Sequence, residues 1–313
     1  MAIYKIPDNM RIGPPVLRVR NIDTAMAFYE NNLGLQVNRS YKANSHGGDY
    51  YDDDVNPIYE IGFKHNISSS SSYEPLLILK HDPNAKKPSL HSAGLFHFAI
   101  LVPDRKSLAS TYLAVKNSGI QYDGFADHLV SESLYLRDPE DNGIEIYRDR
   151  PVNTEGHIMM DTLALDLNSL LAEINYDKEE RNNAKAFPTG ARIGHIHLRV
   201  TNLERSIKFY HEKIGLDITV DWSSMGAAFL SAGGYHHHIG MNTWHSLNGE
   251  AHLSGEAGLE YFTIIIPDRS FVKTLASRIQ QHSSITSNSK QASENQLLLV
   301  SDPDHIQFLI KSE

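Results

Sequence analysis

The chain of 313 residues is 41% hydrophobic and 21% charged, which is typical of globular proteins with two domains of about 150 residues each. Its net charge is −9 and its basic residues form no run, so we expect no nucleic-acid partner. The sequence contains no cysteine. Disulfides and thiolate-bound metals are therefore excluded, and any metal ion must be held by His, Asp, Glu or Tyr.

No segment has the apolar character and the length of about 20 residues that a membrane span requires. Residues 1–5 also lack the apolar region of a signal peptide. We therefore expect a cytoplasmic protein that does not contact a membrane.

Two segments of the sequence occur twice. The run Pro14–Val19 returns in the second half as His195–Val200, and the stretch 94–139 returns as 258–303. Such self-similarity indicates that one supersecondary unit has been duplicated.

Each repeated unit begins with an apolar run that is typical of a strand, such as residues 16–19. The next segment is typical of a helix that begins at an Asn or Asp, as at Asn21, and ends at a glycine, as at Gly34. Shorter alternating runs then indicate further strands. The pattern predicts an α+β fold in which four βαβββ modules pair into two curved mixed-sheet barrels, because one module cannot cover its own apolar face.

We expect two pairs of modules along the chain, one in an N-terminal domain over residues 1–150 and one in a C-terminal domain over residues 191–313. A linker over residues 151–190 should contain one helix, over residues 166–174.

Three polar segments lack the strand and helix patterns of the modules. The serine run 68–72 and the insertion 45–54 are typical of loops, and the charged segment 177–181 is typical of a solvated stretch. We expect no chemistry from any of them.

Three segments carry a resemblance to a known family, namely residues 194–200, 235–244 and 127–147. They resemble vicinal oxygen chelate proteins, and nearly the whole chain is most similar to the bacterial two-domain catechol 2,3-dioxygenases. The superfamily also includes glyoxalase I, fosfomycin resistance proteins, bleomycin-binding proteins and methylmalonyl-CoA epimerase. The fold that the resemblance implies therefore does not determine the reaction.

In this family the first and last strands of each module can carry metal ligands. The corresponding first-strand positions are Pro14, His97, His195 and Tyr261. The last-strand positions fall near His81, at Glu145, within the cluster His236–His238, and at Gln307. The fourth module thus lacks both ligands.

The completeness of a site depends on how the modules pair. Modules that pair in sequence order leave His97 and Glu145 in one barrel and His195 with a cluster histidine in the other. If the second and third modules face each other, one cavity contains His97, His195 and Glu145. That set is a 2-His-1-carboxylate triad, which suits Fe(II) and leaves positions open for substrate and O₂. We expect this pairing, and the sequence does not distinguish assembly within one chain from assembly across the subunit boundary of a homo-oligomer.

The resemblance also implies residues that act beside the metal. Within the cluster, strand alternation would place His236 and His238 on one face and His237 on the other. The match to the family selects His238 as the acid/base, for which an unperturbed pKa of about 6.5 is suitable. The resemblance further implies that His128 and Tyr135 contact substrate or bound oxygen.

The remaining side chains of these segments have structural interpretations. We expect His197 to be structural, although it shares a strand face with His195. Candidates for an aromatic lining of the substrate cavity are Trp222, Phe229, Trp244 and Phe262.

The resemblance therefore implies an Fe(II)-dependent extradiol dioxygenase of aromatic catabolism that converts catechol, or a substituted catechol, with O₂ to a 2-hydroxymuconic semialdehyde. Two alternatives stay open. One is a glyoxalase-like isomerase or lyase with Zn, Ni or Mn, in which His236 or His238 is a fourth ligand. The other is a non-enzymatic protein that binds an aromatic ligand, as the bleomycin-resistance relatives do.

Overall fold

The computed structural model describes residues 4–42, 56–63, 75–151, 158–174, 187–188, 190–281 and 297–312. All elements and contacts below belong to these ranges. The predicted polar segments 45–54, 68–72 and 177–181 lie outside the described residues.

The first two modules follow the predicted βαβββ order. The first contains β1 (Arg11–Val19), α1 (Ile22–Met26) with the π-helical η1 (Ala27–Asn32), β2 (Gln36–Lys42), β3 (Pro57–Gly62) and β4 (Leu77–His81). The second contains β5 (Gly94–Leu101), α2 (Arg105–Asn117), β6 (Gly124–Asp127), β7 (Ser131–Arg137) and β8 (Gly143–Asp149).

The third module repeats this order, and the described residues of the fourth show one strand, a helix and two further strands. The third module contains β9 (Arg192–Arg199), α5 (Leu203–Lys208), the π-helical η2 (Phe209–Ile214), β10 (Asp217–Trp222), the short η3 (Ser223–Met225), β11 (Ala227–Ser231) and β12 (Ile239–Asn242). The described part of the fourth contains β13 (Gly258–Ile266), α6 (Arg269–Gln281), β14 (Leu297–Ser301) and β15 (Gln307–Ser312). None of the described helices has the length and apolar character to cross a membrane.

The helix boundaries follow the capping residues that the sequence predicts. Asn21, Asp104 and Asn202 each accept a hydrogen bond from the backbone N–H three residues later, which satisfies a donor in the first helical turn. The helix of the linker, α3 (Leu167–Leu171), is shorter than predicted and has Asp166 as its N-cap. Gly215 ends η2 with a φ of 96°, a left-handed conformation that favours glycine.

The strands form two curved mixed sheets. Strands of the first and fourth modules make a seven-stranded sheet in the order β14-β15-β13-β1-β4-β3-β2. Strands of the second and third modules make an eight-stranded sheet in the order β10-β11-β12-β9-β5-β8-β7-β6. The expected pairing of the second module with the third is thereby confirmed.

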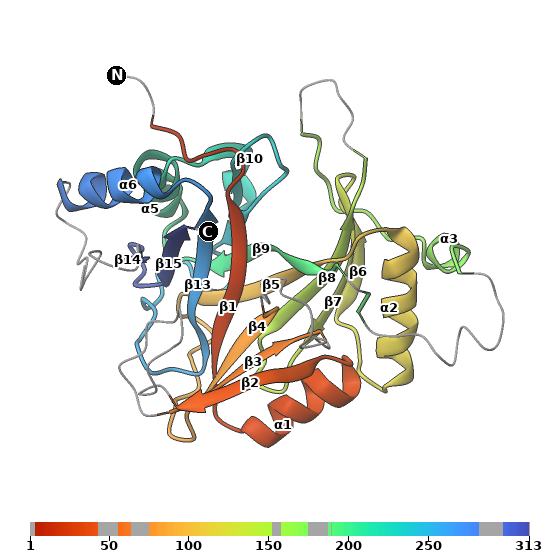
Figure 1. Ribbon diagram of the computed structural model, residues 1–313. Coiled ribbons are helices and arrows are strands. Elements are labelled where there is room, and N and C mark those ends of the chain that lie inside the picture. The colour runs from red at the N-terminus through yellow and green to blue at the C-terminus, as the bar shows by residue number, and fades with distance from the viewer. Residues whose placement is uncertain are drawn as a thin grey trace. The chain divides into compact units, whose positions relative to one another are not determined.

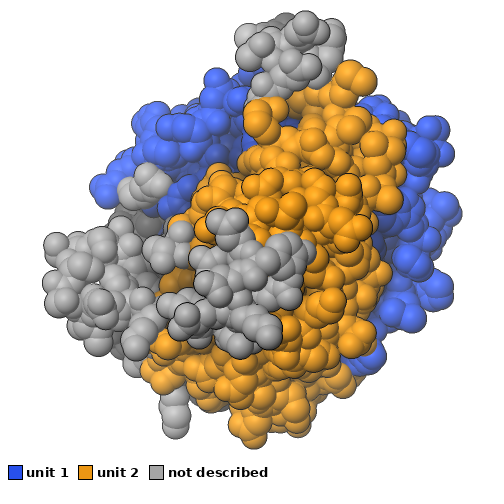
Figure 2. Space-filling model, turned by 90° about the vertical axis from the view of Figure 1, so that its right-hand side faces the viewer, with its two compact units in different colours: residues 1–15, 87–98, 194–313 blue, residues 16–86, 99–193 orange. Residues whose placement is uncertain are grey.

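The described chain divides into two compact units. Unit 1 comprises residues 1–15, 87–98 and 194–313, and unit 2 comprises residues 16–86 and 99–193 (Figure 2). In unit 1, α6 lies along β13, β14 and β15, and in unit 2, α2 lies beside β8 with α3 next to it (Figure 1). The domain boundaries at residues 150 and 191 stay a prediction.

Each unit contains the same buried contact between a tyrosine and an aspartate. In unit 2 the Tyr29 hydroxyl donates to Asp138 Oδ2 at 2.8 Å, and in unit 1 the Tyr210 hydroxyl donates to Asp302 Oδ2 at 3.1 Å. Both aspartates also accept backbone N–H groups of the turn that follows them, such as that of Asn142 at 2.9 Å from Asp138. The turn before the last strand of the unit is thus attached to the π-helical tyrosine.

The contact in unit 1 makes stability depend on pH. Burial, and then the nearby Asp304 carboxylate, raise the pKa of Asp302 to about 7. An unfolded aspartate has a pKa of about 3.9, so between these values the folded state binds the extra proton and stability falls as pH rises.

We therefore predict that Asp302→Asn removes a pH-dependent loss of stability. Between pH 5 and pH 8 the free energy of unfolding of the parent should fall by about 2 kcal/mol more than that of the variant. Urea denaturation of both proteins at several pH values measures the difference. The same comparison with Asp123→Asn, an exposed aspartate, should show no such change. A parent–variant difference that is independent of pH would contradict the assignment.

Candidate metal centre

Two histidines face each other on neighbouring strands of the eight-stranded sheet. His97 lies on β5 and His195 on β9, and their Nε2 atoms are 3.3 Å apart. The residues are 6% and 1% exposed. Two buried imidazole nitrogens at this distance form either a donor–acceptor pair or two lone pairs directed at one cation.

Glu145 lies on β8 between two isoleucines, and it is 3% exposed. The Ser133 hydroxyl of β7 donates to its Oε1 at 2.6 Å, and Tyr135 is its partner in the strand register. Burial of a carboxylate is costly unless hydrogen bonds or a cation compensate it. The location of Glu145 therefore suits a metal ligand.

One ligand atom from each of His97, Glu145 and His195 lies within 4.8 Å of the others. Two imidazoles and one carboxylate form the donor set of non-haem Fe(II) sites, and Mn, Ni and Zn accept the same ligand types. The chemistry of the side chains therefore fits a divalent metal ion.

The histidine cluster differs from the expected strand. His236, His237 and His238 precede β12 and do not belong to a strand, so the predicted alternation of their faces is wrong. The Nδ1 atoms of His236 and His237 lie 2.8 Å apart, and the ring centroid of His237 is 4.0 Å from that of His195. The sequence pattern did not identify His237 as the histidine next to His195, because the prediction assumed the two-residue alternation of a strand and this segment is irregular.

His238 nevertheless continues the pairing of the adjacent strands. Its N–H donates to the Leu230 carbonyl, and its carbonyl accepts from the Ile196 N–H. Its Nδ1 accepts from the Ala232 N–H at 3.4 Å and lies 2.8 Å from Ser231 Oγ. A neutral ring in this position holds its proton on Nε2. The acid/base role of His238 stays a prediction.

The other two residues that the resemblance singled out contact each other. His128 lies in the turn between β6 and β7, and its Nε2 is 2.7 Å from the hydroxyl oxygen of Tyr135. Burial, and then the charge of Glu145, raise the pKa of Tyr135 well above its ordinary value. Tyr135 is therefore a neutral hydroxyl at physiological pH.

His197 lies beside His97 and has a defined hydrogen-bond partner, and its structural role stays a prediction. Its ring centroid is 4.9 Å from that of His97, and Asn242 Nδ2 lies 2.9 Å from its Nε2. Asn242 Oδ1 accepts from the Trp244 N–H, which directs the amide NH₂ toward His197. Because an NH₂ group only donates, His197 is neutral with its proton on Nδ1.

Three of the four aromatic candidates adjoin this group. Phe229 lies against His197 and His237, with Trp222 against Phe229. Trp244 lies 6.1 Å from His197 between ring centroids. Phe262 instead stacks on Phe308 in the seven-stranded sheet, so its assignment to the lining is wrong.

The register also tests two of the expected last-strand positions. Phe262 lies opposite Phe308, so Tyr261 and Gln307, one residue earlier on each strand, are neighbours on β13 and β15. His81 lies opposite Val19, at the other end of β1 from Pro14, so the position near His81 is wrong.

The chain belongs to the glyoxalase/bleomycin resistance protein/dioxygenase superfamily, whose family model matches residues 11–146 and 192–310. It is 36% identical over 281 residues to a catechol-2,3-dioxygenase of Bacillus subtilis, a match that covers 88% of this chain and 89% of that protein.

Solved structures support the fold at low sequence identity. Glyoxalase I from Zea mays has a TM-score of 0.57 at 16% identity, covering 96% of this chain and 92% of that chain. The cppA protein from Streptococcus pneumoniae has a TM-score of 0.53 at 12% identity, covering 99% of this chain and 100% of that chain. At these identities the likeness concerns the fold alone.

The close approach of β12 to His197 leads to a prediction at Gly240. A Cβ atom there would lie 2.7 Å from His197 Nδ1 and 3.0 Å from its Cγ. We predict that Gly240→Ala lowers the free energy of unfolding by about 1–3 kcal/mol, because a buried ring must move. Gly124→Ala is the control, since a Cβ at Gly124 meets nothing within 4 Å, and it should change stability by no more than about 0.5 kcal/mol. Equal stabilities in chemical denaturation would show that His197 is not tightly held.

Proposed function

We propose that the protein is an Fe(II)-dependent extradiol dioxygenase that cleaves catechol, or a small substituted catechol, with O₂ to a 2-hydroxymuconic semialdehyde. The proposal depends above all on the buried group of His97, His195 and Glu145. The identity to a catechol-2,3-dioxygenase over most of both chains supports the same reaction. A cytoplasmic location, a homo-oligomer and a place in aromatic catabolism stay predictions.

In this proposal the three ligands hold Fe(II), and the remaining coordination positions are left to substrate and O₂. A ferrous ion in such a site supplies Lewis acidity and a path for electrons between the catechol and O₂. The two imidazoles are neutral ligands, so Glu145 supplies the only ligand charge. Ser133 orients that carboxylate through its hydrogen bond to Oε1.

The neighbouring side chains have distinct roles in the proposed reaction. His238 holds a proton on Nε2 and offers it to an oxygen atom of the substrate or of O₂. Tyr135 remains a neutral hydroxyl beside the carboxylate ligand, so it adds a hydrogen-bonding group without adding charge. The rings of Phe229, Trp222 and Trp244 limit the access of water.

We predict that His97→Ala and Glu145→Gln each lose bound iron and lower kcat/KM for catechol by more than about a hundredfold, since even second-shell changes cost 10–100-fold. Metal analysis and the appearance of the yellow ring-fission product under air measure the two effects. His245→Ala, at an exposed histidine, is the matched control and should retain both.

Oxygen dependence separates this proposal from the alternatives. The parent protein should form no product from catechol without O₂, and activity should return when air is admitted. A parent that binds no iron, or that gains no activity with added Fe(II), would overturn the proposal in favour of a binding protein. Oxygen-independent turnover of a glyoxalase substrate would instead favour the isomerase.

The Ser133 hydrogen bond leads to a separate prediction. Ser133→Ala should weaken Fe(II) binding by about 10–100-fold, because the Glu145 carboxylate loses its orienting donor. Competition with a chelator of known affinity measures the change. Ser133→Thr keeps a hydroxyl on the strand and should recover most of the affinity; an equal loss in both variants would mean that packing, and not the hydrogen bond, is responsible.

A further inference from the structure

The segment 158–174, which we call the strap, contacts the edge of the eight-stranded sheet and the ring of His128. It lies in unit 2, and its residue Leu163 exchanges two backbone hydrogen bonds of 2.9 Å with Asp127 at the end of β6. β6 is the edge strand of the eight-stranded sheet. The strap therefore covers the end of that edge and lies next to the turn that carries His128.

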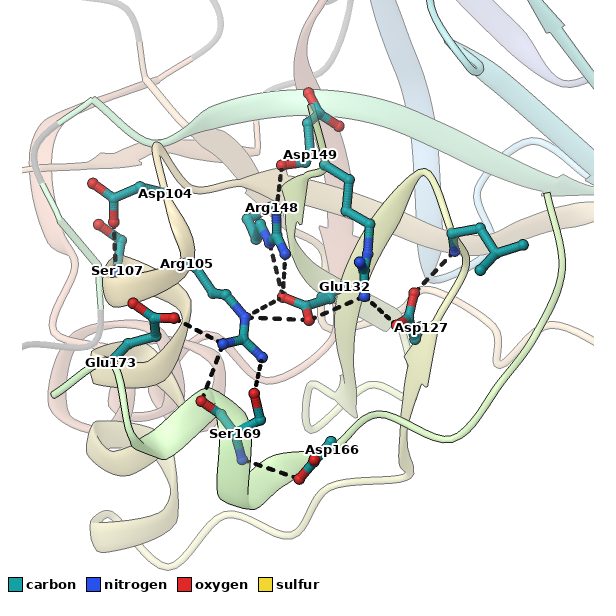
Figure 3. A network of polar contacts seen from close by, with 12 residues as sticks. Asp104, Arg105, Ser107, Asp127, Glu132, Arg148, Asp149, Asp166, Ser169 and Glu173 are labelled. Carbon is teal, nitrogen blue, oxygen red and sulfur yellow. Dashed lines mark hydrogen bonds and ion pairs between the residues drawn. The ribbon is translucent and has the colours of Figure 1, made fainter. Parts of the chain in front are cut away.

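The second half of the strap is attached by ionic contacts at the start of α2. Arg105 donates from Nη1 to the Ser169 carbonyl at 3.0 Å and to Glu173 Oε1 at 2.8 Å, and from Nη2 to Ser169 Oγ (Figure 3). Its Nε donates to the buried Glu132, which also accepts from Arg148. These contacts hold α3 of the strap against α2 and connect it, through Arg105 and Glu132, to β7, the strand on which Tyr135 lies.

The first half of the strap contacts the ring of His128. The His128 Nδ1 atom lies 2.9 Å from the Asp161 carbonyl oxygen, and the Asp161 N–H donates to the His128 carbonyl at 3.3 Å. The Thr162 hydroxyl is farther from Nδ1, at 3.4 Å. A carbonyl oxygen only accepts hydrogen bonds, so Nδ1 carries a proton.

The other ring nitrogen of His128 then has a defined role. In a neutral ring with its proton on Nδ1, Nε2 is an acceptor. Tyr135 is 2.7 Å away, so in this neutral form its hydroxyl donates to Nε2 rather than to Glu145, another side-chain hydrogen-bond partner of the hydroxyl. Because Tyr135 lies opposite Glu145 in the strand register, the direction of this hydrogen bond decides where a proton lies beside the carboxylate.

We infer that the strap is a positioning element, in which the Asp161 carbonyl fixes the Nδ1–H tautomer of His128 and thereby makes the Tyr135 hydroxyl a donor toward His128. The catalytic consequence of this arrangement rests on the proposed dioxygenase function. The tautomer itself does not depend on that function.

Imidazole ¹⁵N NMR of the purified protein tests the inference directly. The His128 signals are identified by their loss in His128→Gln, and the expected pattern is a protonated Nδ1 with an unprotonated Nε2. The spectra are recorded on the protein as purified and after loading with diamagnetic Zn(II), without catechol. A protonated Nε2 with an unprotonated Nδ1 in the parent would overturn the inference, whether or not the protein cleaves catechol.

Two substitutions at Leu163 distinguish the effect of the backbone hydrogen bond of the strap from the effect of the leucine side chain. Leu163→Pro removes the N–H that bonds to Asp127, whereas Leu163→Ala keeps it, and the leucine side chain is 47% exposed. The proline variant should shift His128 toward the Nε2–H tautomer and lower kcat by roughly tenfold to a hundredfold with little change in KM, while the alanine variant matches the parent. An unshifted tautomer in a folded Leu163→Pro protein would contradict the role of the strap, and the parent spectrum decides the tautomer if that variant does not fold.

Discussion

Two buried imidazoles whose Nε2 atoms are 3.3 Å apart set the main constraint on this structure. Without a shared cation, one Nε2 must donate a hydrogen bond to the other. When a cation is bound, the lone pairs of both Nε2 atoms are directed at it. A ligand oxygen of Glu145 lies within 4.8 Å of the ligand nitrogens and brings the negative charge that a divalent ion needs. Such a set arises only because β5 and β9, from different modules, are neighbours in one sheet.

The duplicated modules share structural contacts but differ in their potential metal ligands. The contacts Tyr29–Asp138 and Tyr210–Asp302 attach equivalent turns in the two units, each followed by a last strand. The last strand of one carries Glu145 and that of the other begins with Gln307. The amide of Gln307 provides no negative charge for a cation. The fourth module therefore keeps the tyrosine–aspartate contact but lacks a carboxylate ligand at this position.

Local and periodic features, and the pairing of the second module with the third, were predictable from the sequence, whereas contacts between a side chain and a distant backbone group were not. The helix starts at Asn21 and Asp104 follow from side-chain capping, which acts over three residues. The prediction of which face each residue of His236–His238 occupies was wrong, because the segment is not a strand. The contact of Asp161 with His128 joins residues 33 positions apart through a backbone carbonyl, which no side-chain pattern reveals.

A crystal structure of the protein loaded anaerobically with Fe(II), with anomalous data collected at the iron edge, tests the central claim most directly. The account predicts one iron peak per chain, ligated by Nε2 of His97, Nε2 of His195 and the carboxylate of Glu145. An iron peak bound by other side chains, or no peak beside these three residues at full loading, would contradict it.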